Sequence, residues 1–230
     1  MALNDRQKEI LELTEKKQRI TVAQLAKKLY VSEMTVRRDL AELEQEGLLR
    51  RYHGGAIANQ EYLQYPIGLR MHINEKEKRD LAKRAETYIE NGQTIFLAAS
   101  STCAFLLPCL QHYEGLCVIT NSVYFMQVLT RMQVRCILAG GEYDATDREL
   151  VGRFTERFLR SVNTDIAFLA CDGISDNGMV TVEKESGAEL IRIGFENAKK
   201  RIILADRSKL GNKYTYNICK ADAADDIIVI

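Results

Sequence analysis

Residues 75–230 alternate short apolar runs with polar loops and helical patterns, and this alternation restricts the fold more than any other feature. The apolar runs predict strands over residues 94–97, 116–119, 134–138, 165–170, 201–205 and 227–230. The periodic segments predict helices over residues 75–89, 103–110, 123–131, 149–161 and 185–199. Repetition of strand, loop and helix is typical of a mostly parallel sheet with both faces covered. A chain of 230 residues can bury such a core without disulfides or a bound metal.

The loops that follow these strands are rich in hydroxyl, amide and glycine residues. In open α/β sheets, ligands bind at the carboxyl ends of the strands. Hydroxyls and backbone N–H groups at a helix N-terminus suit a phosphate, and glycine allows close backbone approach. Any single loop is better explained as a helix cap, but five such loops together favour a small phosphorylated or polyol ligand. The candidate ligand residues are Ser100, Ser101, Thr102, Thr120, Asn121, Ser122, Gly140, Gly141, Asp172, Gly173 and Lys209.

The first 57 residues follow a different pattern, that of three short helices and a hairpin. Helices are expected from a cap at Asn4 or Asp5 to about residue 17, over residues 22–29 and over about 33–45, followed by a strand over 48–52 and a turn over 53–55. Thr21 and Gln24 form a capping box, in which each side chain satisfies a backbone donor of the other residue. Ser32 is a good N-cap for the third helix, and Gly47 is expected to end it.

Two short helices joined by a three-residue break are typical of a helix-turn-helix, whose second helix enters the major groove of DNA. Arg can pair with guanine through two hydrogen bonds, and Thr and Ser can contact a base or a phosphate. The basic hairpin that follows would form a wing. The candidate DNA contacts are Ser32, Met34, Thr35, Arg37, Arg38, Arg50, Arg51 and His53. A small helical module with a solvated arginine-rich face fits the pattern about equally well.

The charges cancel over the whole chain, with 32 Lys and Arg against 32 Asp and Glu. This balance argues against a uniformly basic nucleic-acid coat and against a membrane-surface protein. Residues 1–56 hold 11 basic and 9 acidic residues, so a basic surface there would be small and local. No apolar run reaches 18 residues, which predicts no membrane span. The charged run at residues 75–84 is expected to be a solvated helix face.

The cysteines and histidines do not form a metal-binding pattern. The six cysteines, at positions 103, 109, 117, 136, 171 and 219, show no C-x-x-C spacing. Most lie in apolar runs, which predicts buried thiols in a reducing cytoplasm. His53, His72 and His112 have no partner at helical spacing, so neither a metal nor a cofactor is expected.

A close resemblance to the winged helix-turn-helix of the DeoR family of bacterial transcriptional regulators lies in two stretches. These are residues 25–40, LAKKLYVSEMTVRRDL, and residues 47–56, GLLRRYHGGA. The resemblance implies a cytoplasmic repressor that binds operator DNA as a homodimer or homotetramer. It implies recognition-helix contacts from Thr35, Arg37 and Arg38, and wing contacts from Arg50, Arg51 and His53.

Residues further along look like the effector-binding domain of the same family, at 70–74, 120–122, 138–143, 172–173 and 204–209. That domain is similar in fold to phosphopentose isomerases and typically senses a phosphorylated sugar, which implies control of sugar-metabolism genes. Two departures stand out. Ala98 and Ser100 replace the Asp and the frequent Gly of the family, which removes a carboxylate that would accept sugar hydroxyls. Ile230 ends the chain about a strand and a tail early, which would fit a truncated C-terminus.

These patterns predict an α/β protein with a DNA-binding domain over residues 1–57, a linker over 58–74 and an effector-binding domain over 75–230. The alternative is a sugar-phosphate isomerase that carries a DNA-binding domain. Its general base and cation could come from Asp172 and Lys209, with Asp206 or Lys184 nearby. The isomerases place an acidic pair after Asp-Gly and a Gly-rich stretch beyond it. Residues 174–175 and 182–185, Ile-Ser and Val-Glu-Lys-Glu, stand there instead, so a sensor without catalysis is predicted.

Overall fold

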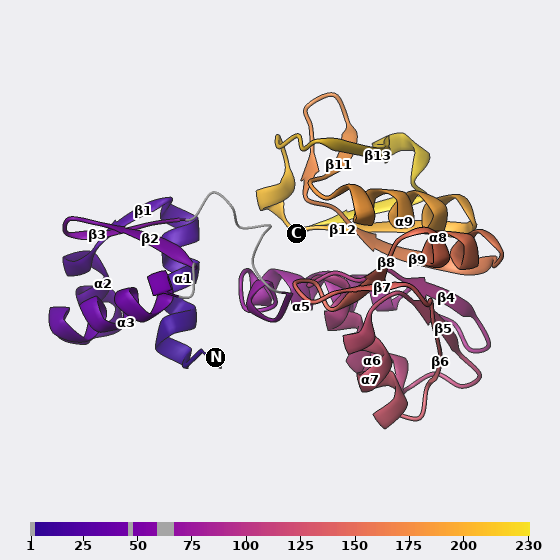
Figure 1. Cartoon of the computed structure of the whole chain (residues 1–230), viewed down its shortest axis with the longest axis horizontal. Helices are drawn as coiled ribbons and strands as arrows, with labels where there is room; N and C mark the ends of the chain where they lie inside the picture. Colours follow the sequence, from indigo (N-terminus) through magenta and orange to yellow (C-terminus); the bar gives the residue numbers. More distant parts are fainter. Residues whose placement is uncertain (1–2, 46–47, 59–66) are drawn as a thin grey trace. The chain divides into compact units, whose positions relative to one another are not determined.

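The computed structural model describes residues 3–45, 48–58 and 67–230. The chain divides into two compact units, the first reaching Asn74 and the second running from Glu75 to Ile230 (Figure 1). The expected linker over residues 58–74 lies partly outside the described residues. Its described part includes a short helix, α4 (Ile67–Arg70), and Ile73, which is 2% exposed in the core of the first unit.

Before the short helix α4, the described residues of the first unit form three helices around a small antiparallel sheet. Its elements are α1 (Asp5–Lys17), β1 (Arg19–Thr21), α2 (Val22–Leu29), α3 (Glu33–Gln45), β2 (Leu49–Tyr52) and β3 (Gly55–Ala58). The strand order is β1-β3-β2. The three predicted helices and the strand are confirmed, whereas β1 was not predicted and β3 begins at Gly55, which was expected to belong to the turn. Gly47, the expected end of α3, lies outside the described residues.

Local capping explains where these helices begin. The capping box of Thr21 and Gln24 opens α2, with the Thr21 hydroxyl accepting from the Gln24 backbone N–H at 3.2 Å. Tyr30 adopts the left-handed conformation (φ 54°) directly after α2, which turns the chain towards α3. The apolar faces of the helices then meet in one core, where Ile10, Leu25 and Val36 are fully buried.

The second unit is built on a parallel sheet with several short additions (Figure 1). Its strands are β4 (Thr94–Leu97), β5 (Cys117–Thr120), β6 (Arg135–Leu138), β7 (Glu142–Asp144), β8 (Glu149–Val151), β9 (Thr164–Ala170), β10 (Gly173–Ile174), β11 (Met179–Val182), β12 (Ala198–Ala205), β13 (Tyr216–Lys220) and β14 (Asp226–Val229). Its α-helices are α5 (Glu75–Glu86), α6 (Leu107–Leu110), α7 (Val123–Arg131), α8 (Arg153–Arg160) and α9 (Glu185–Glu196). Short 3₁₀ helices are η2 (Cys103–Leu106), η3 (Arg207–Lys209) and η4 (Ala221–Ala223).

The main sheet has six strands in the order β14-β12-β9-β4-β5-β6, and every neighbouring pair is parallel. The chain runs outward from β4 to β6 and then returns to β9, which pairs with the other side of β4. Right-handed crossovers in these two directions put α6 and α9 on opposite faces of the sheet. The predicted parallel sheet is confirmed, and its topological switch point lies between β4 and β9.

Four predicted helices need correction. The helix over 75–89 ends at Glu86, because the N–H groups of residues 87–89 bond to carbonyls three residues back and form turns. Residues 149–161 do not form one helix, because Glu149–Val151 is the strand β8 and pairs with β7. Gly152 follows with φ 91°, a conformation that other residues rarely adopt, and α8 begins at Arg153. The segment 103–110 divides into η2 and α6, with Pro108 in the first turn of α6. The helix over 185–199 ends at Glu196, because β12 already begins at Ala198.

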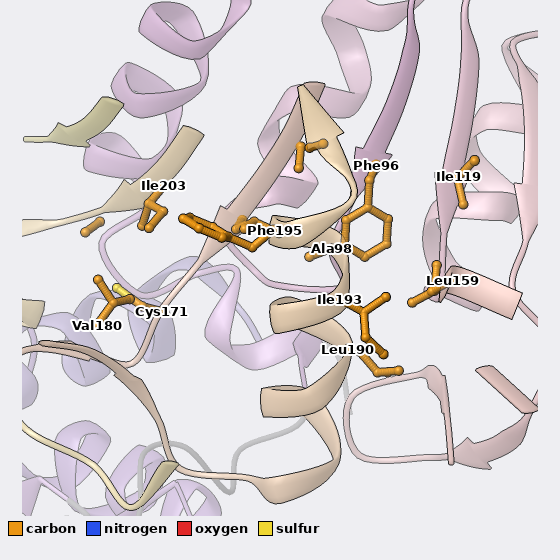
Figure 2. Packing of buried hydrophobic residues seen from close by; sticks show 14 of the residues in the cluster. Phe96, Ala98, Ile119, Leu159, Cys171, Val180, Leu190, Ile193, Phe195 and Ile203 are labelled. Atoms are coloured by element: carbon orange, nitrogen blue, oxygen red, sulfur yellow. The ribbon is translucent and has the colours of Figure 1, made fainter. Parts of the chain in front are cut away.

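A second antiparallel sheet, of order β10-β11-β13, was not predicted. It adjoins the helix α9, which also packs on the main sheet. Gly194 of α9 makes this packing possible, because a Cβ there would lie 2.0 Å from Cε1 of Phe96. Figure 2 shows the Phe96 ring beside the helix that carries Leu190 and Ile193.

Candidate nucleic-acid interface and ligand site

The helix α3 is attached to the first unit by an ion pair on its inner side, in which the carboxylate is buried. Arg6 of α1 donates from Nε and Nη2 to the two carboxylate oxygens of Asp39, at 2.5 and 3.0 Å. Asp39 is 1% exposed. Gln7 adds a hydrogen bond of 2.7 Å from Nε2 to Oε2 of Glu42. The orientation of α3 is therefore fixed by α1, through a contact that was not predicted from the sequence.

The first turn of α3 uses its hydroxyl groups for capping. The Ser32 hydroxyl accepts from the Thr35 backbone N–H at 3.1 Å and lies 2.9 Å from the Thr35 hydroxyl. These are the hydroxyls that were expected to contact DNA. In this geometry each hydroxyl already has a partner inside the turn.

Long side chains extend from the outer face of α3. Met34 is 76% exposed, and the side chains of Arg37 and Arg38 are 52% and 79% exposed. The two guanidinium groups lie 3.3 and 3.4 Å from carboxylate oxygens one helical turn away, of Glu33 and Glu42 respectively. Exposed pairs of this kind contribute little to stability. Both arginines can therefore exchange these carboxylates for the phosphates or bases of DNA.

The hairpin of β2 and β3 carries the predicted wing residues. Arg50, Arg51 and His53 are exposed on it. Arg51 is held at its backbone, where its N–H donates to Oε1 of Glu44 at 2.8 Å. Arg19 of β1 lies over the Tyr52 ring, 4.1 Å from its centroid, so the hairpin is also fixed from its other side. The structure thus brings the recognition-helix and wing candidates onto one unit.

The predicted ligand loops follow the carboxyl ends of strands, and two of them flank the switch point. The loop after β4 contains Ser100, Ser101 and Thr102, and the loop after β9 contains Asp172. Lys78 of α5 lies against the first of these loops. It is 1% exposed, and its Nζ donates to the Ser101 hydroxyl at 3.2 Å.

Lys78 corrects the expectation that residues 75–84 are a solvated face. Leu81, Ala82 and Ala85 are buried at three, four and seven residues after Lys78, so Lys78 belongs to the inward stripe of α5. The spacing of the apolar residues in the sequence therefore already indicated that Lys78 faces inward. The buried ammonium stands beside hydroxyls in a loop, which is an arrangement suited to an anion.

Several of the predicted ligand side chains are engaged within the protein. The Thr120 hydroxyl donates to the Leu97 carbonyl at 2.7 Å and accepts from the Ser122 N–H at 3.1 Å. Ser122 caps α7, and Ser100 accepts from the Cys103 N–H at 2.9 Å. The Asp172 carboxylate accepts from the Glu183 N–H at 2.9 Å.

Asn121 links three segments of the chain. Its Oδ1 accepts from the Ala99 N–H at 3.1 Å, and its Nδ2 donates to Oε2 of Glu149 at 2.9 Å and to the Leu150 carbonyl at 3.3 Å. Its side chain therefore joins the loop after β4 to the hairpin of β7 and β8.

The three predicted glycines have different surroundings. A Cβ on Gly141 would lie 2.0 Å from the Thr155 hydroxyl and 2.5 Å from the Val151 carbonyl oxygen. A Cβ on Gly173 would lie 2.5 Å from the Asn212 carbonyl oxygen. Gly140 has nothing within 4 Å of its Cβ direction. Gly141 and Gly173 are thus required by internal packing, whereas only Gly140 leaves space for an incoming group.

Lys209 contributes a charge near the loop after β9. Burial raises the pKa of the Cys171 thiol to about 12, and the Lys209 ammonium opposes this rise. Asp206, which like Lys209 lies in the segment after β12, is 2% exposed and accepts from the Ser208 N–H at 3.0 Å. All six cysteines are free thiols, two of them buried and four half-buried.

A cluster of charged groups lies on the hairpin of β7 and β8. The carboxylates of Asp144, Asp147 and Glu149 lie within 4.8 Å of one another, and Lys184 forms ion pairs with the first two. Burial, followed by the charge of Asp147, raises the pKa of Glu149 to about 7. Glu149 was not predicted as a site residue, because the sequence pattern places it at the start of a helix over residues 149–161.

The first unit has an anchored helix with exposed arginines and a basic wing, and the second has a parallel sheet with polar loops at its switch point. Together these features define a winged-helix DNA-binding protein with an α/β sensor domain. Two family descriptions match the chain. The DeoR-like helix-turn-helix domain matches residues 6–62, and the DeoR C terminal sensor domain matches residues 73–229. The chain therefore belongs to the DeoR family, and the predicted class of transcriptional regulator is confirmed.

Relatives and solved structures that are similar to this chain differ in how much of it they cover. The chain is 34% identical over 225 residues to the lactose phosphotransferase system repressor of Staphylococcus epidermidis, covering 94% of this chain and 87% of the relative. It is 27% identical to the glycerol-3-phosphate regulon repressor of Escherichia coli, covering 99% and 90%. Ribose 5-phosphate isomerase A from Methanocaldococcus jannaschii matches with a TM-score of 0.44 and 21% identity, over 60% of this chain and 55% of the isomerase chain. The chain thus spans about half the length of that isomerase.

Within residues 3–45, 48–58 and 67–230, no helix is both long and apolar enough to cross a bilayer.

Proposed function

We propose that the protein is a repressor of sugar-metabolism genes that acts in the cytoplasm and leaves its operator when a phosphorylated sugar binds the second unit. The observation that carries the DNA-binding half is the placement of α3, held by Asp39 on one side and presenting Arg37 and Arg38 on the other. The names of two relatives, a lactose phosphotransferase system repressor and a glycerol-3-phosphate regulon repressor, support the metabolic role.

The test of this half is a DNA titration. Arg37→Ala and Arg38→Ala should each weaken binding several-fold, and the slope of log affinity against log salt should become shallower by about 0.9 for each phosphate that the variant no longer neutralises. The probe is a duplex obtained by selection from a random library with the wild-type chain. Arg131→Ala, an exposed arginine of α7, is the control. Unchanged DNA affinity in both α3 variants would show that the arginines of α3 do not contact the DNA.

The ligand half rests on the loops at the switch point. We propose that the phosphate binds between the loop after β4 and Lys78, near Ser101 and Thr102, and that Gly140, Asp172 and Lys209 line the remainder of the site. The buried ammonium of Lys78 supports this, because it lies beside the Ser101 hydroxyl and a cation at low dielectric attracts an anion. Thr120 and Asn121 then serve to hold the loops together, since their hydrogen bonds are made within the protein.

A thermal-shift screen over phosphorylated sugars tests this site, because a ligand of the native state raises the melting temperature. Lys78→Met should abolish the shift that the best sugar phosphate gives to the wild type. Lys83→Met, on the same helix with a side chain 76% exposed, should leave it unchanged. Lys209→Ala should keep operator affinity and reduce release by the sugar phosphate. If no phosphorylated sugar raises the melting temperature, the proposed ligand class is wrong.

We propose further that the protein does not catalyse sugar-phosphate isomerisation. Two of the candidate catalytic groups are engaged elsewhere, since Lys184 pairs with Asp144 and Asp147 and Asp206 caps η3. Incubation of the full chain with pentose and hexose phosphates should give no isomerised product. Sustained turnover would contradict this part of the proposal.

A homodimer or homotetramer is the expected form, because paired recognition helices read two half-sites of an operator. Mass photometry of the full chain with and without the selected duplex would show an even number of subunits on the DNA. A single chain per duplex at saturation would contradict this expectation.

A further inference from the structure

The outer face of α3 has an apolar centre between two cations. At about 100° per residue, Met34 lies about 60° from Arg37 on one side and about 40° from Arg38 on the other. Its side chain is on the surface, and the residue is 76% exposed. The charged side chains beside it are suited to phosphates and guanines, but the thioether is not.

The polar groups in the same turn are already used. The hydroxyls of Ser32 and Thr35 contact each other, and the Glu33 carboxylate lies 3.3 Å from Arg37 Nη2. Met34 is therefore the residue of this turn that extends outward without a polar partner to satisfy. The N-terminal part of a recognition helix is the part that approaches the base edges.

The Met34 side chain does not explain the fold of the first unit. The core of that unit is made by the opposite face of α3, where Val36, Leu40 and Leu43 are 1% exposed or less. The exposed Met34, in the middle of a basic face, is therefore available to contact a binding partner. Among the groups in the major groove, the apolar one is the C5 methyl of thymine.

We propose that Met34 is a specificity-determining residue that contacts a thymine methyl group in each operator half-site. The contact rests on α3 being the helix that enters the major groove, as proposed above. The flanking arginines hold the helix against phosphates or guanines, and the thioether covers the methyl group. Removal of either partner abolishes the same apolar interaction, so removal of both should weaken binding no further than removal of one.

The experiment combines a base change with a side-chain change. Full-length protein first selects duplexes from a random library, and each conserved thymine of the selected duplex is then replaced by uracil, which lacks only the methyl group. At one position per half-site, the replacement should weaken binding of the wild type by about fourfold, the worth of one buried methyl group. The same replacement should not change the affinity of Met34→Ala, because the apolar interaction is already absent.

Two further variants keep the outcome interpretable. Met34→Leu keeps an apolar side chain and should retain the uracil effect. Arg38→Ala should weaken binding to both duplexes while retaining the ratio between them. An equal uracil effect in the wild type and in Met34→Ala would overturn the proposal, and so would the absence of any uracil effect. If the wild type selects no sequence at all, sequence reading by α3 fails altogether, which is distinct from failure of Met34 alone.

Discussion

Asn121 at the end of β5 donates a hydrogen bond of 2.9 Å to the buried carboxyl of Glu149 on β8. The groups that face this carboxyl are Asp144, Asp147, Lys184 and the Asn121 amide. Burial and the nearby Asp147 raise the pKa of Glu149 from about 4.5, the ordinary value, to about 7. The proton of Glu149 is thus bound more tightly in the folded protein than in the unfolded chain.

Glu149→Gln should therefore remove part of the pH dependence of stability. Because the folded pKa is the higher one, the contribution of Glu149 is full below about pH 4.5 and is lost as the pH rises through about 7. The difference in unfolding free energy between Glu149→Gln and the wild type should grow in favour of the variant over this interval. Urea titrations at pH 5, 6, 7 and 8 measure it. Glu183→Gln, at an exposed position, is the control, and parallel curves for Glu149→Gln would contradict the assignment.

Gly194→Ala should destabilise the second unit, although alanine is the better helix former. The added Cβ would lie 2.0 Å from the buried Phe96 ring, and overpacking of this kind costs roughly 1–3 kcal/mol. Gly187 lies on the same helix with nothing within 4 Å of its Cβ direction. Gly187→Ala should therefore stabilise the protein, by up to about 1 kcal/mol. Chemical denaturation measures both, and a stabilising Gly194→Ala would show that the helix can move away from Phe96.

Gly141→Ala and Gly140→Ala should differ although the two glycines are adjacent. The Cβ at position 141 would meet the Thr155 hydroxyl and the Val151 carbonyl oxygen, and the Cβ at position 140 would meet nothing. Gly141→Ala should lower the melting temperature, whereas Gly140→Ala should retain it and weaken any ligand that approaches this loop. Equal melting temperatures for the two variants would refute the distinction.

Arg6→Met should impair both stability and DNA binding, although Arg6 lies outside the predicted reading face. The change removes the cation from the buried Asp39 carboxylate, which costs roughly 1–3 kcal/mol, and it loosens the attachment of α3. Calorimetry and a DNA titration of the same samples measure the two effects. Lys8→Met removes an exposed pair with Asp5 and should change stability by less than about 0.5 kcal/mol. If Arg6→Met bound DNA with wild-type affinity, the ion pair would not be needed to orient α3.

The elements that the sequence predicted best are those with local signals. The helix α7 and the strand β4 were predicted to the residue, and the approximate bounds predicted for α1 and α3 agree with the structure. Ser122 at the start of α7 illustrates the reason, because its hydroxyl accepts from the Phe125 N–H and marks the first turn within four residues of sequence.

The elements that were missed depend on partners far along the chain. The strands β11 and β13 pair with each other although α9 and β12 lie between them in the sequence. The short β8 is held by β7 and Asn121. In the site, the strand order that brings the loops after β4 and β9 together is likewise a tertiary property. Lys78 is the exception, since the helical period placed it on the inward face and only its charge suggested exposure.

The neighbouring positions of β4 and β9 have a consequence for any ligand that spans their loops. These strands are adjacent in the sheet but belong to halves of the unit that are built successively by the chain. A small molecule held by both loops would act as a reversible cross-link between the two halves. It would lower the population of states in which the halves separate, so occupancy would register as rigidity throughout the sheet and not only at the site.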